Sequence, residues 1–337
     1  MAVTTSPYAS DALLGGTVDA VVIGGGAAGL NGALMLARSR RSVVVIDSGS
    51  PRNAPAEAMH GFIVLDGTPP PEILRRGREQ VRQYGGRVVF GEVAAAEPAA
   101  PSTDGDLRFT ITLADGRSVT ARRVLVATGL TDVLPEVPGL AEHWGHGVVH
   151  CPYCHGWEVR DEPIGILATG PASIGHAFLF RQLTADLTYF TQGIDLDEDT
   201  RARFAARNIH IVDTPVREVV NNEDGTLAGL RLTDGQVVAR RVLAVATRME
   251  ARTEGLDGLK LPVEDLPDNM GRRVASGMAG TTEVPGVWVA GNATDLAAQV
   301  GASAAAGALA GAHINSMLAT ADTNAALAAT QGETPAL

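Results

Sequence analysis

The sequence predicts an α/β protein in which one dinucleotide-binding fold is inserted into another, and three observations support this. A strand, helix and strand with a glycine-rich turn occupy residues 20–47, and a second unit of the same kind occupies residues 163–190. Near the C-terminus a further buried strand precedes an Ala-rich helix, which indicates that the first fold resumes there. We therefore expect a discontinuous first domain, residues 1–134 and 270–337, and an inserted domain, residues 135–269.

The composition indicates a globular, acidic protein. Of the 337 residues, 45% are hydrophobic and 19% are charged, and the net charge is -11. These values do not suit a disordered chain, and nucleic acids or anionic membranes attract basic proteins. Residues 1–18 lack the basic and apolar segments of a signal peptide, and polar residues interrupt the Ala- and Gly-rich stretch 287–319. We expect a cytoplasmic protein with no membrane span and no nucleic-acid partner.

The first turn carries the pattern G-x-G-x-x-G directly between a strand and a helix. The first glycine permits the tight turn, the second lets a pyrophosphate approach the backbone, and the third lets the helix pack closely on the strand. An aspartate ends the second strand, where it can accept hydrogen bonds from an adenosine ribose. A merely structural glycine turn is the alternative. The predicted dinucleotide site includes Gly24, Gly26, Ala27, Ala28, Gly29 and Asp47.

Further contacts to this dinucleotide are expected where later segments reach the same edge of the sheet. Residues 48–53 form a turn-rich segment, and residues 123–129 form an apolar strand that ends in a small-residue turn. Between them, residues 71–84 read as an amphipathic helix and residues 87–119 as alternating strands. A lone histidine in this region is more often a satisfied surface or core residue. The candidates are Ser48, Arg52, Asn53, His60, Ala127, Thr128, Gly129, Gly291, Asn292 and Asp295.

The Ala-rich helix near the C-terminus is expected to start near Gln299 and Val300. The free N–H groups and positive dipole end of that helix suit the negative charge that develops on a flavin during reduction. Ordinary core packing is the alternative, because Ala and Gly serve both purposes. Residues 320–337 are expected to form a mobile tail.

The glycine pattern of the second unit is damaged. Ala168, Gly170 and Ser173 stand at its three glycine positions, and Pro171 removes one backbone N–H from the turn. The segment 195–199 is acidic where a basic pair would bind the 2′-phosphate of NADPH. We expect a retained fold with little or no nicotinamide binding.

The two cysteines of the chain, Cys151 and Cys154, lie between His150 and His155. Two thiols at this spacing can close a small disulfide ring, and such pairs are typical of redox centres. A zinc site is one alternative, but it usually needs a second, well-separated pair of ligands. A structural disulfide is another, although so short a loop gains little entropy on closure. We predict a redox-active disulfide.

Together, the first glycine turn with Asp47, Ala127-Thr128-Gly129, the C-x-x-C pair and residues 291–295 resemble the low-molecular-weight thioredoxin reductases over nearly the whole chain. That resemblance implies an FAD domain split around a nicotinamide-type domain that holds the redox cysteines, and a homodimer. His155 stands where those enzymes have an acid, and the second glycine turn and its basic pair are lost. Cys-Pro-Tyr-Cys-His-Gly-Trp-Glu is instead similar to dithiol oxidases that form disulfides in natural products such as holomycin and gliotoxin.

This resemblance implies FAD as the sole redox cofactor, NADPH being doubtful, a small dithiol as substrate and molecular oxygen as electron acceptor. By family analogy, Cys151 is the exposed sulfur and Cys154 lies beside the flavin. His155 is the first candidate for the acid/base group and His150 the second, with a structural role as the alternative for His150. Two rival functions are an NADPH-dependent reductase of thioredoxin or a small disulfide, and a non-catalytic flavoprotein that sequesters dithiols or senses redox state.

Overall fold

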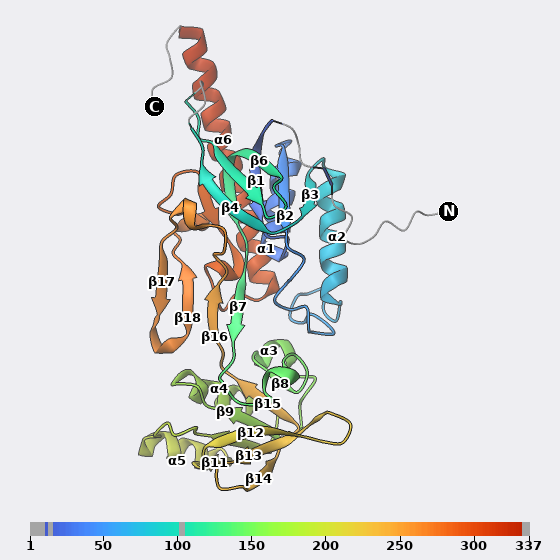
Figure 1. Cartoon of the computed structure of the whole chain (residues 1–337), viewed down its shortest axis with the longest axis vertical. Helices are drawn as coiled ribbons and strands as arrows, with labels where there is room; N and C mark the ends of the chain where they lie inside the picture. Colours follow the sequence, from blue (N-terminus) through green and yellow to red (C-terminus); the bar gives the residue numbers. More distant parts are fainter. Residues whose placement is uncertain (1–10, 13–15, 101–104, 332–337) are drawn as a thin grey trace, which may run out of the picture.

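Two strands, β7 (Leu130–Val133) and β16 (Arg248–Ala251), connect an upper and a lower unit of the molecule (Figure 1). They pair antiparallel, with Leu130 opposite Ala251 and Val133 opposite Arg248. The computed structural model describes residues 11–12, 16–100 and 105–331. Its arrangement of two dinucleotide-binding units, one inserted into the other, confirms the predicted fold class.

The upper unit is built on a seven-stranded sheet with the order β3-β2-β1-β6-β5-β4, and β19 pairs with β6. Its central strands are runs of β-branched residues buried on both faces, which is typical of parallel sheets. The sheet's strands are β1 (Thr17–Ile23), β2 (Val43–Asp47), β3 (Arg87–Phe90), β4 (Val93–Pro98), β5 (Phe109–Leu113), β6 (Ser118–Val126) and β19 (Val287–Val289). The residues predicted as a strand at 123–126 are thus the end of the longer strand β6.

Glycines let two helices pack closely beside this sheet. A Cβ atom added at Gly307 of α6 (Val300–Gln331) would collide with the carbonyl of Ala28 in α1 (Ala27–Arg38). A Cβ added at Gly311 would lie 2.5 Å from the carbonyl oxygen of Gly32. The small residues of the stretch 287–319 therefore serve close helix packing, as the sequence predicts. The third helix, α2 (Pro70–Gln83), contacts α1.

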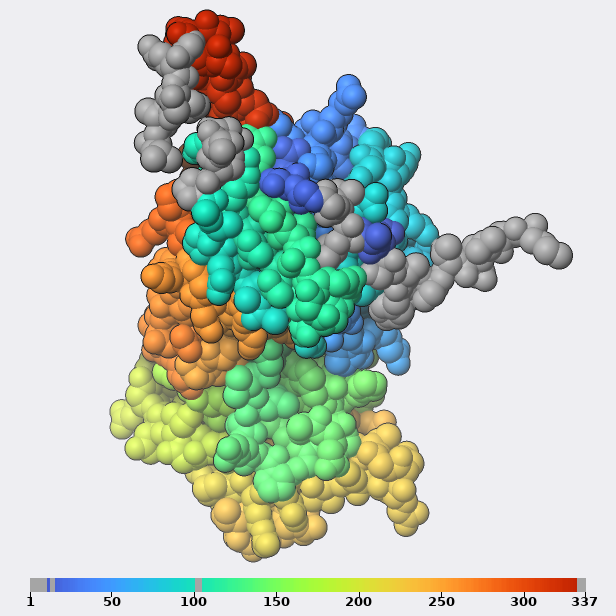
Figure 2. Space-filling model, turned by 45° about the horizontal axis from the view of Figure 1, so that its top comes forward, coloured from blue at the N-terminus to red at the C-terminus, as the bar shows by residue number. Residues whose placement is uncertain are grey.

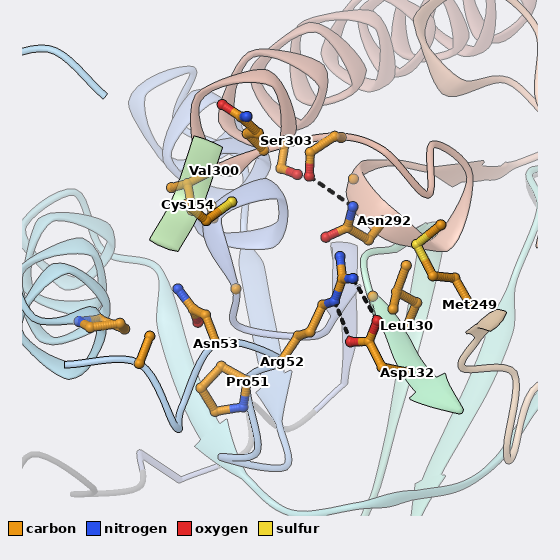
Figure 3. A pocket seen from close by; sticks show the side chains of 18 of the residues that line it. Pro51, Arg52, Asn53, Leu130, Asp132, Cys154, Met249, Asn292, Val300 and Ser303 are labelled. Atoms are coloured by element: carbon orange, nitrogen blue, oxygen red, sulfur yellow. Dashed lines mark hydrogen bonds and ion pairs between the residues drawn. The ribbon is translucent and has the colours of Figure 1, made fainter. Parts of the chain in front are cut away.

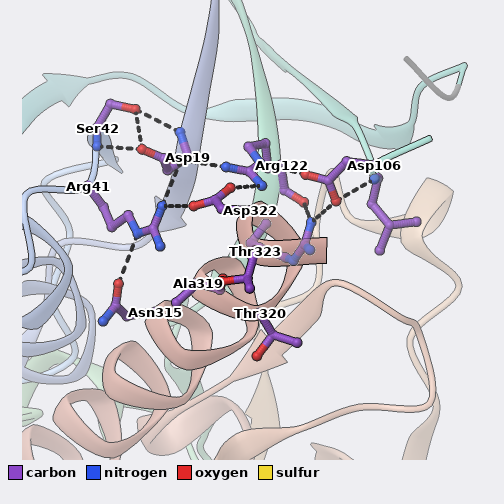
Figure 4. A network of polar contacts seen from close by, with 12 residues as sticks. Asp19, Arg41, Ser42, Asp106, Arg122, Asn315, Ala319, Thr320, Asp322 and Thr323 are labelled. Atoms are coloured by element: carbon purple, nitrogen blue, oxygen red, sulfur yellow. Dashed lines mark hydrogen bonds and ion pairs between the residues drawn. The ribbon is translucent and has the colours of Figure 1, made fainter. Parts of the chain in front are cut away.

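The end of α6 differs from the prediction. Residues 320–331, expected to belong to a mobile tail, continue the helix. Asp322 accepts ion pairs of 2.6 Å from Arg41 and from Arg122, and Arg122 also binds Asp19 and Asp106 (Figure 4). This network connects the helix to β1, to β6 and to the loop before β2, which the sequence of the tail did not reveal.

The lower unit contains a five-stranded sheet with the order β11-β10-β9-β15-β8 and a three-stranded antiparallel sheet. Its core gathers Phe180, Tyr189 and Phe204, all fully buried. The sheets comprise β8 (Val148–Val149), β9 (Ile164–Leu167), β10 (Leu187–Phe190), β11 (Ile209–Val212), β12 (Val216–Asn221), β13 (Leu227–Leu232), β14 (Val237–Ala239) and β15 (Val242–Val245). The helices are α3 (Pro152–His155), α4 (Ala172–Phe180) and α5 (Glu198–Ala206).

A fourth sheet, of four strands, carries the chain back into the upper unit. It has the order β17-β18-β16-β7, with β17 (Val263–Leu266) and β18 (Gly271–Val274). Leu256 and Leu259 pack in the core of the seven-stranded sheet. We therefore propose that the second domain boundary lies near residue 247 rather than 269. The short 3-10 helices are η1 (Ala141–His143), η2 (Asp257–Leu259), η3 (Pro267–Asn269), η4 (Met278–Gly280) and η5 (Gly291–Ala293).

Candidate active site

A cavity of about 1050 Å³ joins the first glycine turn to the cysteine pair. Figure 3 shows part of its lining, with labelled residues from the segment after β2, from β7 and from α6, together with Cys154. The cavity thus brings together residues from both units. The predicted residues that line it are Gly24, Gly26, Ala27, Ala28, Asp47, Ser48, Arg52, Asn53, His60, Ala127, Thr128, Gly129, His150, Cys151, Cys154, His155, Gly291, Asn292, Gln299 and Val300.

The three predicted glycines of the first turn each have a distinct geometry. Gly24 has φ +107°, and an added Cβ would collide with the carbonyl of Ala127. At Gly26, which precedes α1, no other atom lies within 4 Å of an added Cβ. An added Cβ at Gly29 would collide with Gly24, so this glycine serves helix packing and does not line the cavity. Of these three glycines, only Gly26 faces open space.

Asp47 occupies the end of β2 at the edge of the cavity. Its side chain is largely buried, and Oδ1 accepts a hydrogen bond of 3.2 Å from the N–H of Gly49. The second oxygen lies 3.8 Å from the guanidinium of Arg78. A largely buried carboxylate beside a cavity is suited to accept hydrogen bonds from ligand hydroxyl groups.

The segment before α6 forms a turn held by one amide side chain. Asn292 donates to the carbonyl oxygens of Asp295 and Ala298 at 3.0 and 2.8 Å. Asp295 is exposed and is not among the residues that line the cavity, and its carboxylate accepts a hydrogen bond of 3.1 Å from the N–H of Ala297. Val300 starts α6 and lines the cavity, and Figure 3 draws it next to Cys154. The first N–H groups of a helix have no partner within the helix, so this terminus offers donors to a ligand.

The cysteines form a disulfide at the start of α3, with their Cα atoms 5.2 Å apart. Cys151 is the N-cap residue, and its sulfur accepts a hydrogen bond of 3.1 Å from the N–H of Cys154. Pro152 stands at the first helical position, where its missing N–H has no cost. After reduction the same N–H would stabilise a thiolate on Cys151.

Hydrogen bonds hold both the side chain and the backbone carbonyl of His150. Its Nδ1–H donates to the carbonyl of Val245 at 3.0 Å, so Nε2 carries the lone pair of the neutral ring. The Nε2–H of His176 donates to the carbonyl of His150. Burial lowers the pKa of His150, so the ring is neutral at neutral pH. These contacts fix the residue directly before Cys151.

His176 of α4 also lines the cavity and was not a candidate in the sequence. Burial and the neighbouring His150 lower its pKa to about 4. Its Nδ1 is buried and has no hydrogen-bond partner among the described residues. Its ring packs edge-on against Phe180, with the centroids 5.0 Å apart. His176 thus supports the cysteine segment as a neutral ring.

His155 follows Cys154 in α3 and is only partly buried. Burial lowers its pKa, while Glu158 and Glu57 act in the opposite direction. His60 and His146 are close enough to lower the pKa further. His155 therefore combines access to the cavity with a neutral ring at physiological pH, which is the state of a proton acceptor.

The guanidinium of Arg52 is paired with a carboxylate and is therefore not a free positive charge in the cavity. Its guanidinium forms two hydrogen bonds of 2.7 Å with the carboxylate of Asp132 (Figure 3). Burial alone would raise the pKa of Asp132, but Arg52 and the hydroxyl of Thr247 lower it overall. Thr247 lies 3.4 Å from Nδ1 of His150. A polar chain therefore runs from the loop after β2 to the residue that precedes Cys151.

The glycine turn of the lower unit uses its polar groups internally. The N–H of Thr169 donates to the hydroxyl of Ser173 at 3.0 Å, and Ser173 is fully buried. The Thr169 hydroxyl donates to the carbonyl of Ala246 at 2.6 Å. Pro171 contributes no N–H, so this turn offers fewer donors to a phosphate group than an intact glycine turn would.

Within residues 11–12, 16–100 and 105–331, no group of three or more His, Cys, Asp or Glu side chains is arranged to hold a metal ion. The helices of this described part include none that is long and apolar enough to cross a membrane.

Known proteins resemble the chain over most of its length. The sequence model of the pyridine nucleotide-disulphide oxidoreductase family matches residues 18–312. Thioredoxin reductase tcpT of Claviceps purpurea is 35% identical over 282 residues, covering 82% of this chain and 86% of that protein. Thioredoxin reductase aclD of Aspergillus oryzae is 30% identical over 308 residues, covering 89% and 96%. The crystal structure of HlmI gives a TM-score of 0.87 at 42% identity, covering 94% of this chain and 98% of that chain.

FAD is the cofactor of this family, and the cavity fits it. The open space at Gly26 can admit a pyrophosphate beside the N-terminus of α1, and Asp47 can accept hydrogen bonds from a ribose. The start of α6 offers N–H donors at the cysteine end. In the corresponding turn of the lower unit, the N–H of Thr169 is already bonded to Ser173. The chain belongs to the pyridine nucleotide-disulphide oxidoreductase family, as a thioredoxin reductase-like flavoprotein that binds FAD.

Proposed function

We propose that the protein is a dithiol oxidase that forms an intramolecular disulfide in a small dithiol, with molecular oxygen as the final electron acceptor and hydrogen peroxide as a product. The observation that carries the proposal is the cavity shared by the cysteine pair and the dinucleotide turn, combined with a second glycine turn in which the Thr169 N–H is bonded to Ser173 and Pro171 has no N–H. A dithiol can supply electrons at the cysteines, whereas the turn of the lower unit lacks some of the hydrogen-bond donors that would bind the phosphate groups of NADPH.

The first exchange opens the enzyme disulfide. A substrate thiol gives its proton to a base, and the resulting sulfur attacks Sγ of Cys151. A bond forms between substrate and Cys151, while the bond between Cys151 and Cys154 breaks and leaves a thiolate on Cys154. We assign Cys154 as the inner sulfur by family analogy, and its lining of the same cavity as Val300, at the start of α6, supports this.

The second exchange releases the product. The other substrate thiol loses its proton and attacks the substrate sulfur that is bound to Cys151, so Cys151 leaves as a thiolate. The N–H of Cys154, 3.1 Å from the Cys151 sulfur, favours that departure because it stabilises negative charge there. The substrate has then lost two electrons and two protons, and both cysteines are reduced. When bound in this cavity, FAD would supply the two-electron acceptor for the reduced cysteine pair, with oxygen as the final acceptor.

His155 is the proposed base, and His150 a positioning residue. His155 is neutral, partly exposed and next in sequence to Cys154, so it can take a proton from a thiol at the cavity mouth. The Nδ1–H of His150 is committed to Val245, and its carbonyl to His176. These bonds favour a role in holding Cys151 over a role in proton transfer.

From the family resemblance we also propose a cytoplasmic homodimer that acts in antibiotic biosynthesis or self-resistance. Light scattering coupled to gel filtration would measure the mass of the holoenzyme. A mass of one 34.9 kDa chain would contradict the dimer without affecting the proposed chemistry.

An anaerobic titration of the holoenzyme tests the proposed function. We expect the flavin absorbance to persist with NADPH, to bleach with dithiothreitol, and to return with peroxide when air is admitted. Cys154→Ser should retain FAD but resist bleaching by dithiothreitol. Stoichiometric bleaching by NADPH would instead identify an NADPH-dependent reductase. Tight binding of a dithiol without bleaching would indicate a protein that only sequesters dithiols or senses them.

A further inference from the structure

Two aromatic side chains stand in solvent on the segment that carries the cysteines. Tyr153, between the cysteines, is 65% exposed, and Trp157 is 66% exposed. Tyr153 also lines the cavity, and the guanidinium of Arg160 lies 4.2 Å from the centre of the Trp157 ring. Large aromatic groups are rarely left in water beside a reactive group unless they contact a ligand or partner.

A second apolar element is the loop of residues 59–68. The N–H of Met59 donates to the carbonyl of Thr68 at 2.9 Å and closes the base of the loop. Its tip exposes Ile63 by 85% and Val64 by 92%. Val64 has φ 73°, a left-handed conformation that is strained for a β-branched residue. The fold therefore holds two large apolar side chains in solvent on a strained loop.

One histidine joins this loop to the cysteine segment. His60 places Nδ1 3.3 Å from a carboxylate oxygen of Asp66, within the loop, and Nε2 3.4 Å from one of Glu158. Figure 2 shows the blue segment that contains the loop against the green segment that contains the cysteines. His60, Met59 and Tyr153 line the same cavity. The apolar loop and the exposed aromatic rings therefore belong to one entrance.

Carboxylates surround this entrance. Asp66 and Glu158 flank His60, and Glu57 and Glu158 are near enough to His155 to influence its pKa. Arg160, which lies on the Trp157 ring, adds one positive charge to the three negative charges of Glu57, Asp66 and Glu158. The charge of Arg52 is already paired with Asp132. Like charges disfavour the approach of an anion, and apolar surface favours an uncharged organic group.

We propose that this entrance selects uncharged, largely apolar dithiols and rejects anionic thiols such as glutathione. The inference rests on the proposed function and adds its substrate class. The apolar contact comes from Ile63, Val64, Tyr153 and Trp157, and the exclusion of anions comes from Glu57, Asp66 and Glu158. A substrate arrives as a neutral thiol and loses its proton only beside Cys151, which is consistent with the neutral base His155.

Two dithiols that differ in charge test the proposal. 2,3-Dimercaptopropanol and 2,3-dimercaptopropane-1-sulfonate carry the same vicinal thiols, but the second adds an anion. We mix each anaerobically with the holoenzyme, quench with an alkylating agent, and count reduced cysteines by mass spectrometry. We expect the neutral dithiol to react about fivefold faster or more at low ionic strength, with a smaller ratio at 1 M salt because salt screens the repulsion.

The outcomes separate this inference from the proposed function. If neither dithiol reduces the cysteine pair, the proposed function fails. If both reduce it equally fast at low salt, the function stands and the selectivity is wrong. A faster reaction of the sulfonate would also overturn the selectivity.

Variants assign the selectivity to residues. The double variant Glu57→Gln/Glu158→Gln should bring the two rates closer together, whereas Glu264→Gln should not; Glu264 is 45% and Glu158 40% exposed, and each takes part in an ion pair. Ile63→Ser should slow the neutral dithiol more than the sulfonate. Met278→Ser, at a residue 84% exposed elsewhere on the surface, is its matched control. Unchanged rates in both test variants would contradict the proposal that these residues select the substrate.

Discussion

Asp132 of β7 accepts a hydrogen bond of 2.7 Å from the hydroxyl of Thr247, which directly precedes β16. The bond therefore ties together the two segments by which the chain enters and leaves the lower unit. Arg52 adds two bonds of 2.7 Å to the same carboxylate. The Asp132 side chain is 5% exposed, so its charge depends on these partners.

Replacing Asp132 by Asn should loosen this junction. Arg52 would lose its anion, and we expect the free energy of unfolding to fall by about 1–3 kcal/mol, less than for a fully buried pair because Arg52 is partly exposed. Thr247→Val should cost about 1 kcal/mol through the lost hydrogen bond, while Thr247→Ser keeps the hydroxyl and serves as control. Urea unfolding measures these changes. Wild-type stability of Asp132→Asn would show that the junction does not depend on this carboxylate.

Two glycines of the first turn should respond differently to alanine. Gly24→Ala places a methyl group against Ala127 at positive φ, so the protein should lose about 1–3 kcal/mol of stability even without cofactor. Gly26→Ala fills only open space, so the apoprotein should keep its stability and bind FAD at least about tenfold more weakly. Urea unfolding of the apoproteins and titration of FAD fluorescence separate the two effects. Equal FAD affinity of Gly26→Ala and wild type would place the pyrophosphate elsewhere.

His155→Ala should slow the reduction of the cysteine pair by a dithiol most at low pH. Burial lowers the pKa of His155, so the ring remains a base below neutral pH, where few free thiols are ionised. We expect a loss of about tenfold or more at pH 6 and a smaller loss at pH 8.5. The exposed His146 is nearby, and His146→Ala is the control. A loss that is the same at both pH values would argue against proton transfer by His155.

His176 should make stability depend on pH. Its pKa is lowered to about 4 in the folded protein from an ordinary value of 6.5, so protonation favours the unfolded chain. Stability should be constant above pH 6.5 and fall as the pH drops from 6.5 toward 4, by about 2–3 kcal/mol in total. His176→Gln should lose this component, whereas His210→Gln, at an exposed position, should retain it. Parallel pH profiles of urea unfolding for wild type and His176→Gln would refute the assignment.

The sequence predicted the segments whose chemistry is local. The glycine turn at Gly24, the end of β2 at Asp47 and the disulfide between Cys151 and Cys154 depend on neighbours in the chain, and the structure places all of them on one cavity. Their spacing is set by backbone geometry that repeats in this class of fold. The architecture of an inserted domain followed from the same periodic patterns.

Contacts between distant residues were not predictable in this way. Asp132 and Thr247 lie 115 residues apart, and neither stands in a recognisable motif. His176 reads as an ordinary helical residue until the fold brings its Nε2–H to the carbonyl of His150. The prediction of a mobile tail from residue 320 is wrong for residues 320–331, and residues 332–337 lie outside the described part of the chain. The ion pairs of Asp322 with Arg41 and Arg122 could not be read from composition alone.

The hydrogen bond from Thr169 to Ser173 bears on which metabolites would control the rate of the enzyme in the cell. A reductase that draws on NADPH follows the balance of oxidised and reduced nicotinamide, and it works toward breaking disulfides. In the function that we propose, this turn does not bind NADPH, and the electrons come from the thiols that reach the cysteine pair. Starvation or oxidative stress that drains the nicotinamide pool would then leave the reaction running, and its pace would follow the concentrations of dithiol and oxygen.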